Sequence, residues 1–170
     1  MRKSLFLGLS AGFLMLASHA SAEFTGSVGG TYIDFDGAEI VAATGTLGYR
    51  FPLGANFSFQ PEVRGGFGVT DDDISVLGEN VEVEIDNLYG FSGRFQLDFG
   101  NGFFLYAQPT YTRIEASAEV TRFDVSASDD SWEFGAGGGL GFRFNQRFGV
   151  EAGYERIDDA DVINAALRFY

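Results

Sequence analysis

Several residue types with reactive side chains are missing from most of this chain. The 170-residue sequence has no cysteine, its single histidine is His19 and its single lysine is Lys3. Disulfide bonds and thiol chemistry are therefore excluded, and beyond residue 22 there is neither a histidine base nor a lysine nucleophile. The same absences remove the usual zinc ligands. We expect no catalytic residue, no cofactor and no metal site.

Positive charge is also scarce along the chain. Beyond residue 22 there are nine basic residues, all arginine, against 24 acidic residues, which gives a net charge of −15. Proteins that bind nucleic acids or anionic membrane surfaces carry a basic footprint, because their partners are negatively charged. The composition therefore excludes nucleic acid as an expected partner.

The sequence has one long apolar run, and it lies at the N-terminus. A basic start precedes the run Leu5–Ala17, and small residues follow it as far as Ala22. This order is typical of a secretory signal peptide, and the run is short for a membrane anchor. We predict a signal peptide over residues 1–22 and a single domain over residues 23–170. Since the domain lacks a long apolar run, it can cross a membrane only as a closed β-barrel.

The domain is instead rich in alternating apolar and polar residues, with many of the 19 phenylalanines and 24 glycines of the chain. Alternation with a period of two predicts β-strands. Most of the eight alternating segments reach the ~9–11 residues that a tilted transmembrane strand needs. The segments are Phe24–Phe35, Val41–Phe51, Phe57–Val69, Val81–Phe99, Phe103–Ile114, Ser131–Phe144, Phe148–Ile157 and Val162–Phe169.

The links between these segments form two groups that alternate along the chain. Tight polar turns follow the second, fourth and sixth segments, at Pro52–Asn56, Gly100–Gly102 and Asn145–Arg147. The other links are acidic or longer, and the longest, Glu115–Asp130, itself alternates and is predicted to protrude as a hairpin. Short turns at one end and longer loops at the other are typical of outer-membrane barrels.

Each predicted strand has one apolar face and one polar face. The apolar faces together carry about thirty side chains, more than the interior of an eight-stranded barrel can hold. We therefore predict that the apolar faces contact lipid, and that the polar faces with their glycines line a narrow lumen. Arginine suits such a lumen because its guanidinium binds carboxylates with two hydrogen bonds.

The predicted ion-pair network of the lumen, with a structural role, consists of Glu62, Arg64, Glu84, Arg94, Glu133, Arg143, Glu151 and Arg168. Carboxylate pairs such as Glu151 with Glu155 are assigned to ion pairing rather than to acid–base catalysis, since arginines share their face. An aromatic girdle is predicted beside the tight turns. Its members are Tyr49, Phe51, Phe57, Phe99, Phe103, Phe142, Phe144, Phe148 and Phe169.

The chain resembles the small eight-stranded outer-membrane β-barrels of Gram-negative bacteria, the porin-like group that includes the OmpA-like and OmpX or opacity types. The resemblance covers residues 23–170 and rests on the eight segments, the strand ends Gly48–Phe51 and Gly141–Phe144, and the aromatic end of Ile163–Tyr170. It implies an all-β fold, an eight-stranded antiparallel up-and-down transmembrane β-barrel. It also implies a monomer in the outer membrane that contacts lipid and lipopolysaccharide, with a C-terminal strand read by the barrel-assembly machinery.

The function expected from this resemblance is not enzymatic. Lipid-modifying enzymes of similar architecture need a histidine, which residues 23–170 lack. We expect a structural, surface-interaction or adhesion role with an unknown extracellular ligand. Two alternatives stay open at this point: a narrow pore for small solutes or ions, and a soluble periplasmic barrel that binds an apolar ligand as a lipocalin does.

Overall fold

The structure is a computed structural model that describes residues 23–35, 38–70, 72–76, 79–120 and 125–170. Side chains are not described at 35 and 38, nor within 72–76, 79–86, 116–120 and 125–130, where the description covers the backbone alone. The predicted signal peptide, residues 1–22, lies outside the described residues. The described part of the chain contains no helix long and apolar enough to cross a membrane.

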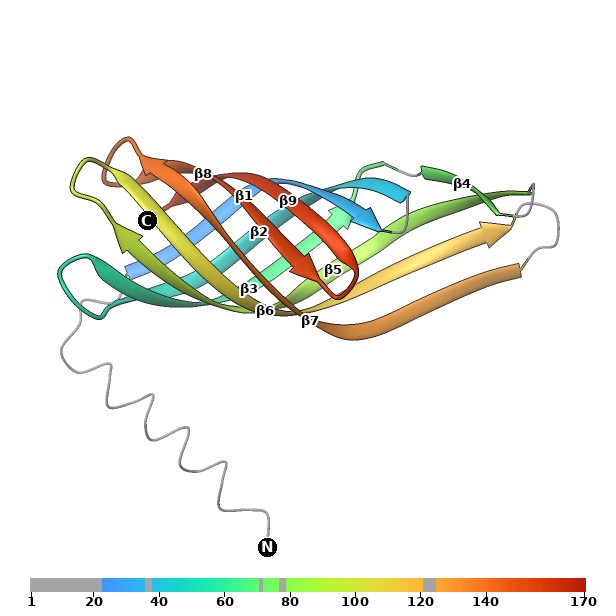
Figure 1. Cartoon of the computed structure of the whole chain (residues 1–170), viewed down its shortest axis with the longest axis horizontal. Coiled ribbons are helices and arrows are strands. Elements are labelled where there is room, and N and C mark those ends of the chain that lie inside the picture. Colours follow the sequence, from blue (N-terminus) through green and yellow to red (C-terminus); the bar gives the residue numbers. More distant parts are fainter. Residues whose placement is uncertain (1–22, 36–37, 71, 77–78, 121–124) are drawn as a thin grey trace, which may run out of the picture.

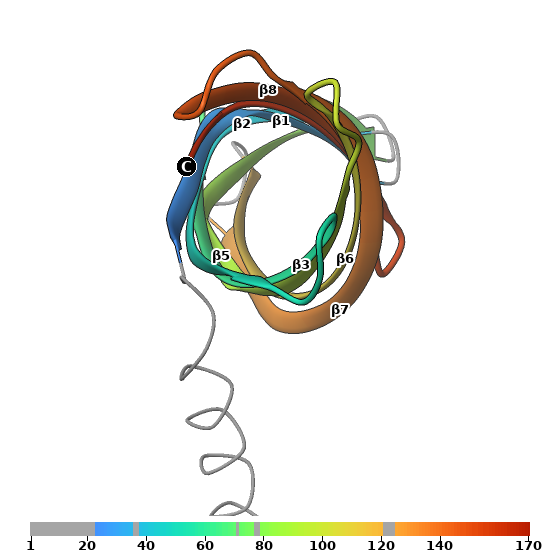
Figure 2. The same ribbon diagram turned by 90° about the vertical axis from the view of Figure 1, so that its left-hand side faces the viewer.

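The described residues form nine β-strands, eight of which close into a barrel (Figures 1 and 2). The ring order is β3-β2-β1-β9-β8-β7-β6-β5, the pairing of β3 with β5 closes it, and all neighbours are antiparallel. This confirms the predicted all-β, eight-stranded antiparallel barrel. The strands are β1 (Glu23–Phe35), β2 (Ala38–Pro52), β3 (Phe57–Gly68), β4 (Asp72–Val76), β5 (Glu79–Asp98), β6 (Phe103–Val120), β7 (Val125–Arg143), β8 (Phe148–Ile157) and β9 (Ala160–Phe169).

Strand β4 differs from the sequence-based prediction, which treats Thr70–Asn80 as a link. Its five residues pair with β5 from Asp72↔Val83 to Val76↔Glu79. The reason is that β5 continues beyond Leu88, the last residue at which β3 is its neighbour. Here the segment that precedes β5 in the chain pairs with it as β4 and gives these backbone groups hydrogen-bond partners.

Strands β5, β6 and β7 are the longest, with 20, 18 and 19 residues. The β6–β7 ladder continues to Val120↔Val125, so the predicted hairpin in the link Glu115–Asp130 is confirmed by its backbone pairing. With β4, these strands extend beyond the rest of the barrel, at the right in Figure 1. We call this extension the protruding sheet; it comprises residues 72–76, 79–86, 115–120 and 125–133.

The two faces of the barrel wall have opposite character. Large apolar side chains point outward, and Phe91, Phe67 and Phe134 are 58, 57 and 67% exposed. The charged side chains of Arg94 and Arg168 point inward and are 1 and 0% exposed. This is the predicted orientation, and it is the reverse of what a soluble barrel with an apolar interior requires.

The tight turns and the C-terminus lie at the opposite end from the protruding sheet (Figure 1). In the turn between β7 and β8, the Asn145 side-chain oxygen accepts hydrogen bonds from the backbone N–H groups of Arg147 and Phe148, both at 2.8 Å. Asparagine favours turns for this reason. Strand β9 closes the barrel with Phe169 beside Gly26 of β1, and Tyr170 then donates its N–H to the Arg147 carbonyl at 2.9 Å.

Candidate functional site

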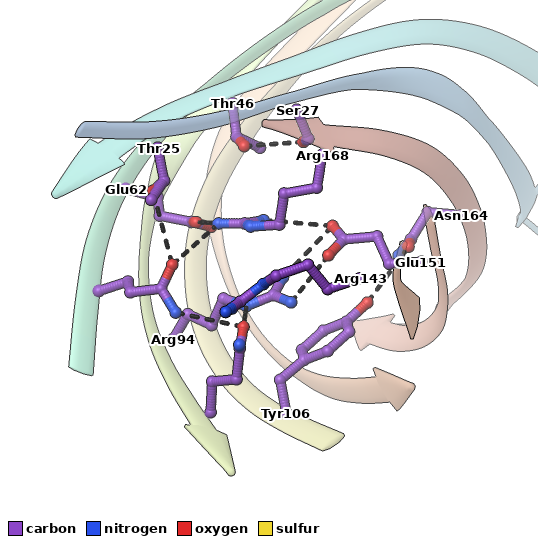
Figure 3. Close-up of polar contacts among 12 residues, drawn as sticks. Thr25, Ser27, Thr46, Glu62, Arg94, Tyr106, Arg143, Glu151, Asn164 and Arg168 are labelled. Carbon is purple, nitrogen blue, oxygen red and sulfur yellow. Dashed lines mark hydrogen bonds and ion pairs between the residues drawn. The ribbon is translucent and has the colours of Figure 1, made fainter. Parts of the chain in front are cut away.

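Buried charges cross-link the strands through the middle of the lumen (Figure 3). Glu151 on β8 accepts hydrogen bonds from Arg94 on β5, at 3.3 and 2.8 Å, and from Arg168 on β9, at 3.2 Å. Arg168 also forms an ion pair with Glu62 on β3. Four strands are thus joined by one chain of charges in which arginines and carboxylates alternate. Such pairing is what makes burial of charge tolerable in a lumen of low dielectric.

Aromatic rings line the same part of the lumen. The guanidinium carbon of Arg94 lies 3.6 Å from the centre of the Tyr106 ring and 5.7 Å from that of Phe104. The Tyr106 hydroxyl donates to the Asn164 side-chain oxygen at 3.4 Å, as Figure 3 shows. Tyr106 fits because Gly153 faces it; a β-carbon at Gly153 would overlap the hydroxyl oxygen. A glycine on the lumen face therefore makes room for a large neighbour.

A second ion pair lies nearer the protruding sheet. Arg64 donates to both carboxylate oxygens of Glu155, at 3.1 and 2.8 Å, and the Thr110 hydroxyl also donates to Glu155. The predicted network names Arg64 but not Glu155, although Glu155 is assigned from the sequence to ion pairing rather than to catalysis. The signal for Glu155 was present, because it lies four residues after Glu151 and so occupies the same face of β8.

A third group of charges lies at the tight-turn end. Asp98 accepts from Arg50 at 2.5 Å and from Arg143 at 3.3 Å, and the Arg143 guanidinium lies 4.0 Å from the centre of the Tyr170 ring. Arg50 also lies 3.6 Å from Glu23. Arg143, predicted for the lumen network, forms its ion pair here with Asp98. Asp98 was missed, although its position two residues after Gln96 places it on the lumen face.

Two predicted network residues are not brought into the lumen. Strand β8 pairs with β7 only from Gly135 onward, so Glu133 lies beyond the barrel rim, where it accepts a hydrogen bond from Ser131. The backbone of Glu84 pairs with Ser117 in the protruding sheet, and its side chain lies outside the described part of the structure. Glu133 keeps the parity of the lumen face, but its strand has left the barrel at that level. Parity does not carry over to Glu84, because the β5–β6 register shifts between Ile85 and Asn87.

The interior is not polar throughout, which corrects the sequence-based prediction. Near the protruding sheet, inward-facing apolar residues form a buried cluster, and Ile114 packs against it. The members of this apolar layer are Ile33, Ile40, Leu88, Ile157, Ala160 and Val162. The layer covers the charges from the side opposite to the tight turns. Its residues have lumen parity, so the alternation itself could have revealed them.

Between the apolar layer and the central charges lies a cavity of about 50 Å³. Its walls include Glu62, Arg64, Arg168 and Asn164. Within the described residues, Glu62 Oε2 and Arg168 Nε are buried without a hydrogen-bond partner. A buried water needs about 10–15 Å³ of such space, so a few waters fit here and suit these two atoms. The described residues bring no three metal-ligating side chains together.

The outer surface carries aromatic side chains near both ends of the barrel. The residues predicted for the girdle lie on strands and turns at the tight-turn end, and Phe103 and Phe142 pack with their ring centres 4.8 Å apart. A second cluster, absent from the predicted girdle, surrounds Trp132 near the rim. Its ring stacks on Phe91 at 6.2 Å and on Tyr111 at 5.0 Å. Two aromatic bands separated by an apolar surface are typical of a barrel that spans a membrane.

A closed antiparallel barrel with this outer surface and with paired charges buried in its lumen defines a transmembrane β-barrel. The sequence also shows the family. The chain belongs to the outer membrane protein beta-barrel domain family, which matches residues 4–169. The protein is therefore an outer-membrane protein that contacts membrane lipid.

Solved structures share this fold at low sequence identity. Ail, the attachment invasion locus protein of Yersinia pestis, has a TM-score of 0.62 at 16% identity, over 89% of this chain and 97% of that one. Neisserial surface protein A (NspA) has a TM-score of 0.56 at 10% identity, over 88% and 98% of the two chains. The N-terminal barrel of Pseudomonas aeruginosa OprF gives the same four values. No curated protein sequence matches the chain.

Proposed function

We propose that this protein is a non-enzymatic surface-interaction or adhesion protein, in which the barrel is the anchor and the protruding sheet contacts a partner outside the cell. The observation that carries the proposal is the open edge of β7. Strand β8 accompanies β7 only from Gly135 to Arg143, and Val125–Glu133 has no described neighbour on that side. An open strand edge can bind a partner by adding a strand to the sheet.

The position of the sheet supports an extracellular role. In outer-membrane barrels the short turns face the periplasm and the longer connections face outward. Here the tight turns lie at the end opposite to the protruding sheet (Figure 1). One solved structure of Ail, which has the same fold, is a complex with the heparin analogue sucrose octasulfate. A barrel of this fold thus can bind a ligand, which agrees with a surface role for this chain.

The lumen supports a structural role rather than catalysis. Its carboxylates Glu151 and Glu155 are each held by arginines, and a general base must instead be free to accept a proton. We propose that the paired charges lock the strands in register and keep the anchor rigid. We further propose that residues 1–22 are a cleaved signal peptide and that β9 is recognised by the barrel-assembly machinery. In the membrane, the barrel acts as a monomer whose outer face also contacts lipopolysaccharide.

The proposal can be tested by shortening the hairpin. In the variant, residues 116–129 are replaced by Asn-Gly, a pair that favours a two-residue turn between strands. The paired residues Glu115 and Asp130 then become the last pair of the β6–β7 ladder. Binding of the reconstituted variant and of the intact protein to a panel of cell surfaces and matrix proteins is compared.

Loss of binding with an unchanged barrel, judged by far-UV circular dichroism and by resistance to unfolding in detergent, is the expected result. A control variant with Asp159→Asn, in the exposed link between β8 and β9, should bind as the intact protein does. Equal binding by the shortened and the intact protein would contradict a contact through the protruding sheet.

A further inference from the structure

The direction of the backbone groups along the open edge of β7 follows from two hydrogen bonds. The Phe134 carbonyl accepts from the Asp158 N–H at 3.4 Å and so points away from β6, whereas the Arg143 N–H donates to the Gly102 carbonyl at 2.8 Å, towards β6. In a regular strand the N–H and C=O of one residue point to the same side, and successive residues alternate. Ser126, Ser128 and Asp130 therefore direct both groups to the open side.

The charge of the protruding sheet is extreme. Its residue ranges, 72–76, 79–86, 115–120 and 125–133, contain eleven acidic residues and no lysine or arginine. A strand added to β7 would lie about 4.8 Å from it. Exposed charges are largely screened beyond about 8 Å at physiological ionic strength. An added strand lies within that distance of β7, so the charge of the sheet contributes to its binding.

This charge decides among the possible partners of the edge. A second copy of the chain would bring the same acidic strands together, and like charges facing each other across strands are destabilising. A sulfated or phosphorylated surface would be repelled in the same way. A segment rich in lysine or arginine gains both the backbone hydrogen bonds and the attraction of opposite charges.

We propose that the protruding sheet binds basic polypeptide segments, which add to β7 as an extended strand. The inference rests on the proposed function and names the chemistry of its partner. The backbone groups of β7 supply hydrogen bonds along the added strand, and the acidic residues of the sheet select for positive charge and speed association.

The experiment uses the full protein in nanodiscs of zwitterionic lipid and three synthetic peptides as probes. One peptide alternates threonine and lysine, one alternates threonine and glutamate, and the third is the lysine peptide with proline in place of threonine. Two edge variants are compared. Ser128→Pro removes an N–H on the open side and leaves the ladder to β6 intact, because an edge strand tolerates proline where its N–H faces away from the sheet. Ser128→Ala keeps that N–H. A third variant, Asp129→Asn with Asp130→Asn, removes charge without altering the backbone.

The expected result is binding of the threonine–lysine peptide alone. Its affinity should fall by up to about tenfold in Ser128→Pro, as expected when one backbone hydrogen bond is lost, and stay unchanged in Ser128→Ala. Raising the salt concentration and the double Asn variant should each weaken it. Binding of the glutamate peptide, or equal binding of the intact protein and the double Asn variant, would overturn the charge preference.

Equal binding of the proline peptide, with no effect of Ser128→Pro, would overturn strand addition, because charge alone would then account for the affinity. These outcomes differ from failure of the proposed function. If hairpin shortening abolishes surface binding while the sign of the peptide charge makes no difference, the surface role stands and this inference falls. If shortening changes nothing, the surface role itself falls.

Discussion

Removing the negative charge of Glu151 is expected to destabilise the barrel strongly. Glu151 is 8% exposed and is the carboxylate shared by Arg94 and Arg168. Glu151→Gln keeps the size of the side chain but leaves an excess positive charge in the lumen. Removing one partner of a buried ion pair costs about 3–5 kcal/mol. We expect the lower end of this range, because Arg168 retains Glu62 and Arg94 retains Gln96.

The assay is reversible unfolding in detergent micelles or lipid vesicles, followed by the fluorescence of Trp132, the single tryptophan of the chain. The control is Asp159→Asn, since Asp159 is 76% exposed and lies 3.9 Å from Arg156. Exposed pairs of this kind contribute little, so the control should unfold as the intact protein does.

The double variant Glu151→Gln with Arg94→Gln separates the ion pair from general damage. Because the second change removes the uncompensated cation, the double variant should lose less stability than the sum of the two single variants. Strict additivity, or a Glu151→Gln variant as stable as the control, would refute the view that the paired charges hold the strands together.

Three further predictions concern the lumen. Leu88→Ala should lower the free energy of unfolding by about 2–5 kcal/mol, because it opens a hole in the apolar layer. Gly153→Ala should lower the free energy of unfolding by about 1–3 kcal/mol, because its new methyl group overlaps the Tyr106 hydroxyl. Adding Tyr106→Phe should recover part of this stability, and no recovery would contradict the contact. The intact protein in planar bilayers should show no discrete conductance steps, since Ile33, Leu88 and Ile157 close the lumen with apolar side chains; regular steps would revive the narrow pore.

The strands and their orientation were predictable because alternation with a period of two is a local property. Each side chain on β6 from Phe103 to Thr112 takes the face that its parity predicts, and a single stretch of sequence suffices to see this. The eight-stranded barrel was predicted from the number of such alternating segments. No partner strand needs to be known for either step.

The ion-pair partners could not be predicted in the same way. Arg64 and Glu155 meet across 91 positions of sequence, and whether Arg64 faces Glu151 or Glu155 depends on the stagger of strands around the barrel. The odd or even position of a residue along its strand shows whether its side chain faces the lumen, but not at which height along the barrel axis it lies. For the same reason parity assigns Glu133 to the lumen, although its strand passes the rim. For Glu84 parity itself fails, because the register of β5 shifts between Ile85 and Asn87.

Strand β4 and the apolar layer were missed for different reasons. The β4 sequence begins with two aspartates, which are rare in strands, and it is held there by pairing with β5 rather than by its own preference. The parity of Ile33 and Ile157 in the sequence already places them on the lumen face. An apolar residue near the end of one strand does not by itself indicate a cluster, however, because the cluster forms only when the ends of several strands come together.

The most direct test of the account is the accessibility of single cysteines along β6, a natural choice because the chain has no cysteine. Spin labels attached one at a time across residues 103–112 report contact with oxygen dissolved in lipid. The account predicts high accessibility at Leu105, Ala107 and Tyr111 and low accessibility at Gln108 and Thr110, in strict alternation. Uniform accessibility, or the reverse alternation, would show that the apolar face does not meet the membrane.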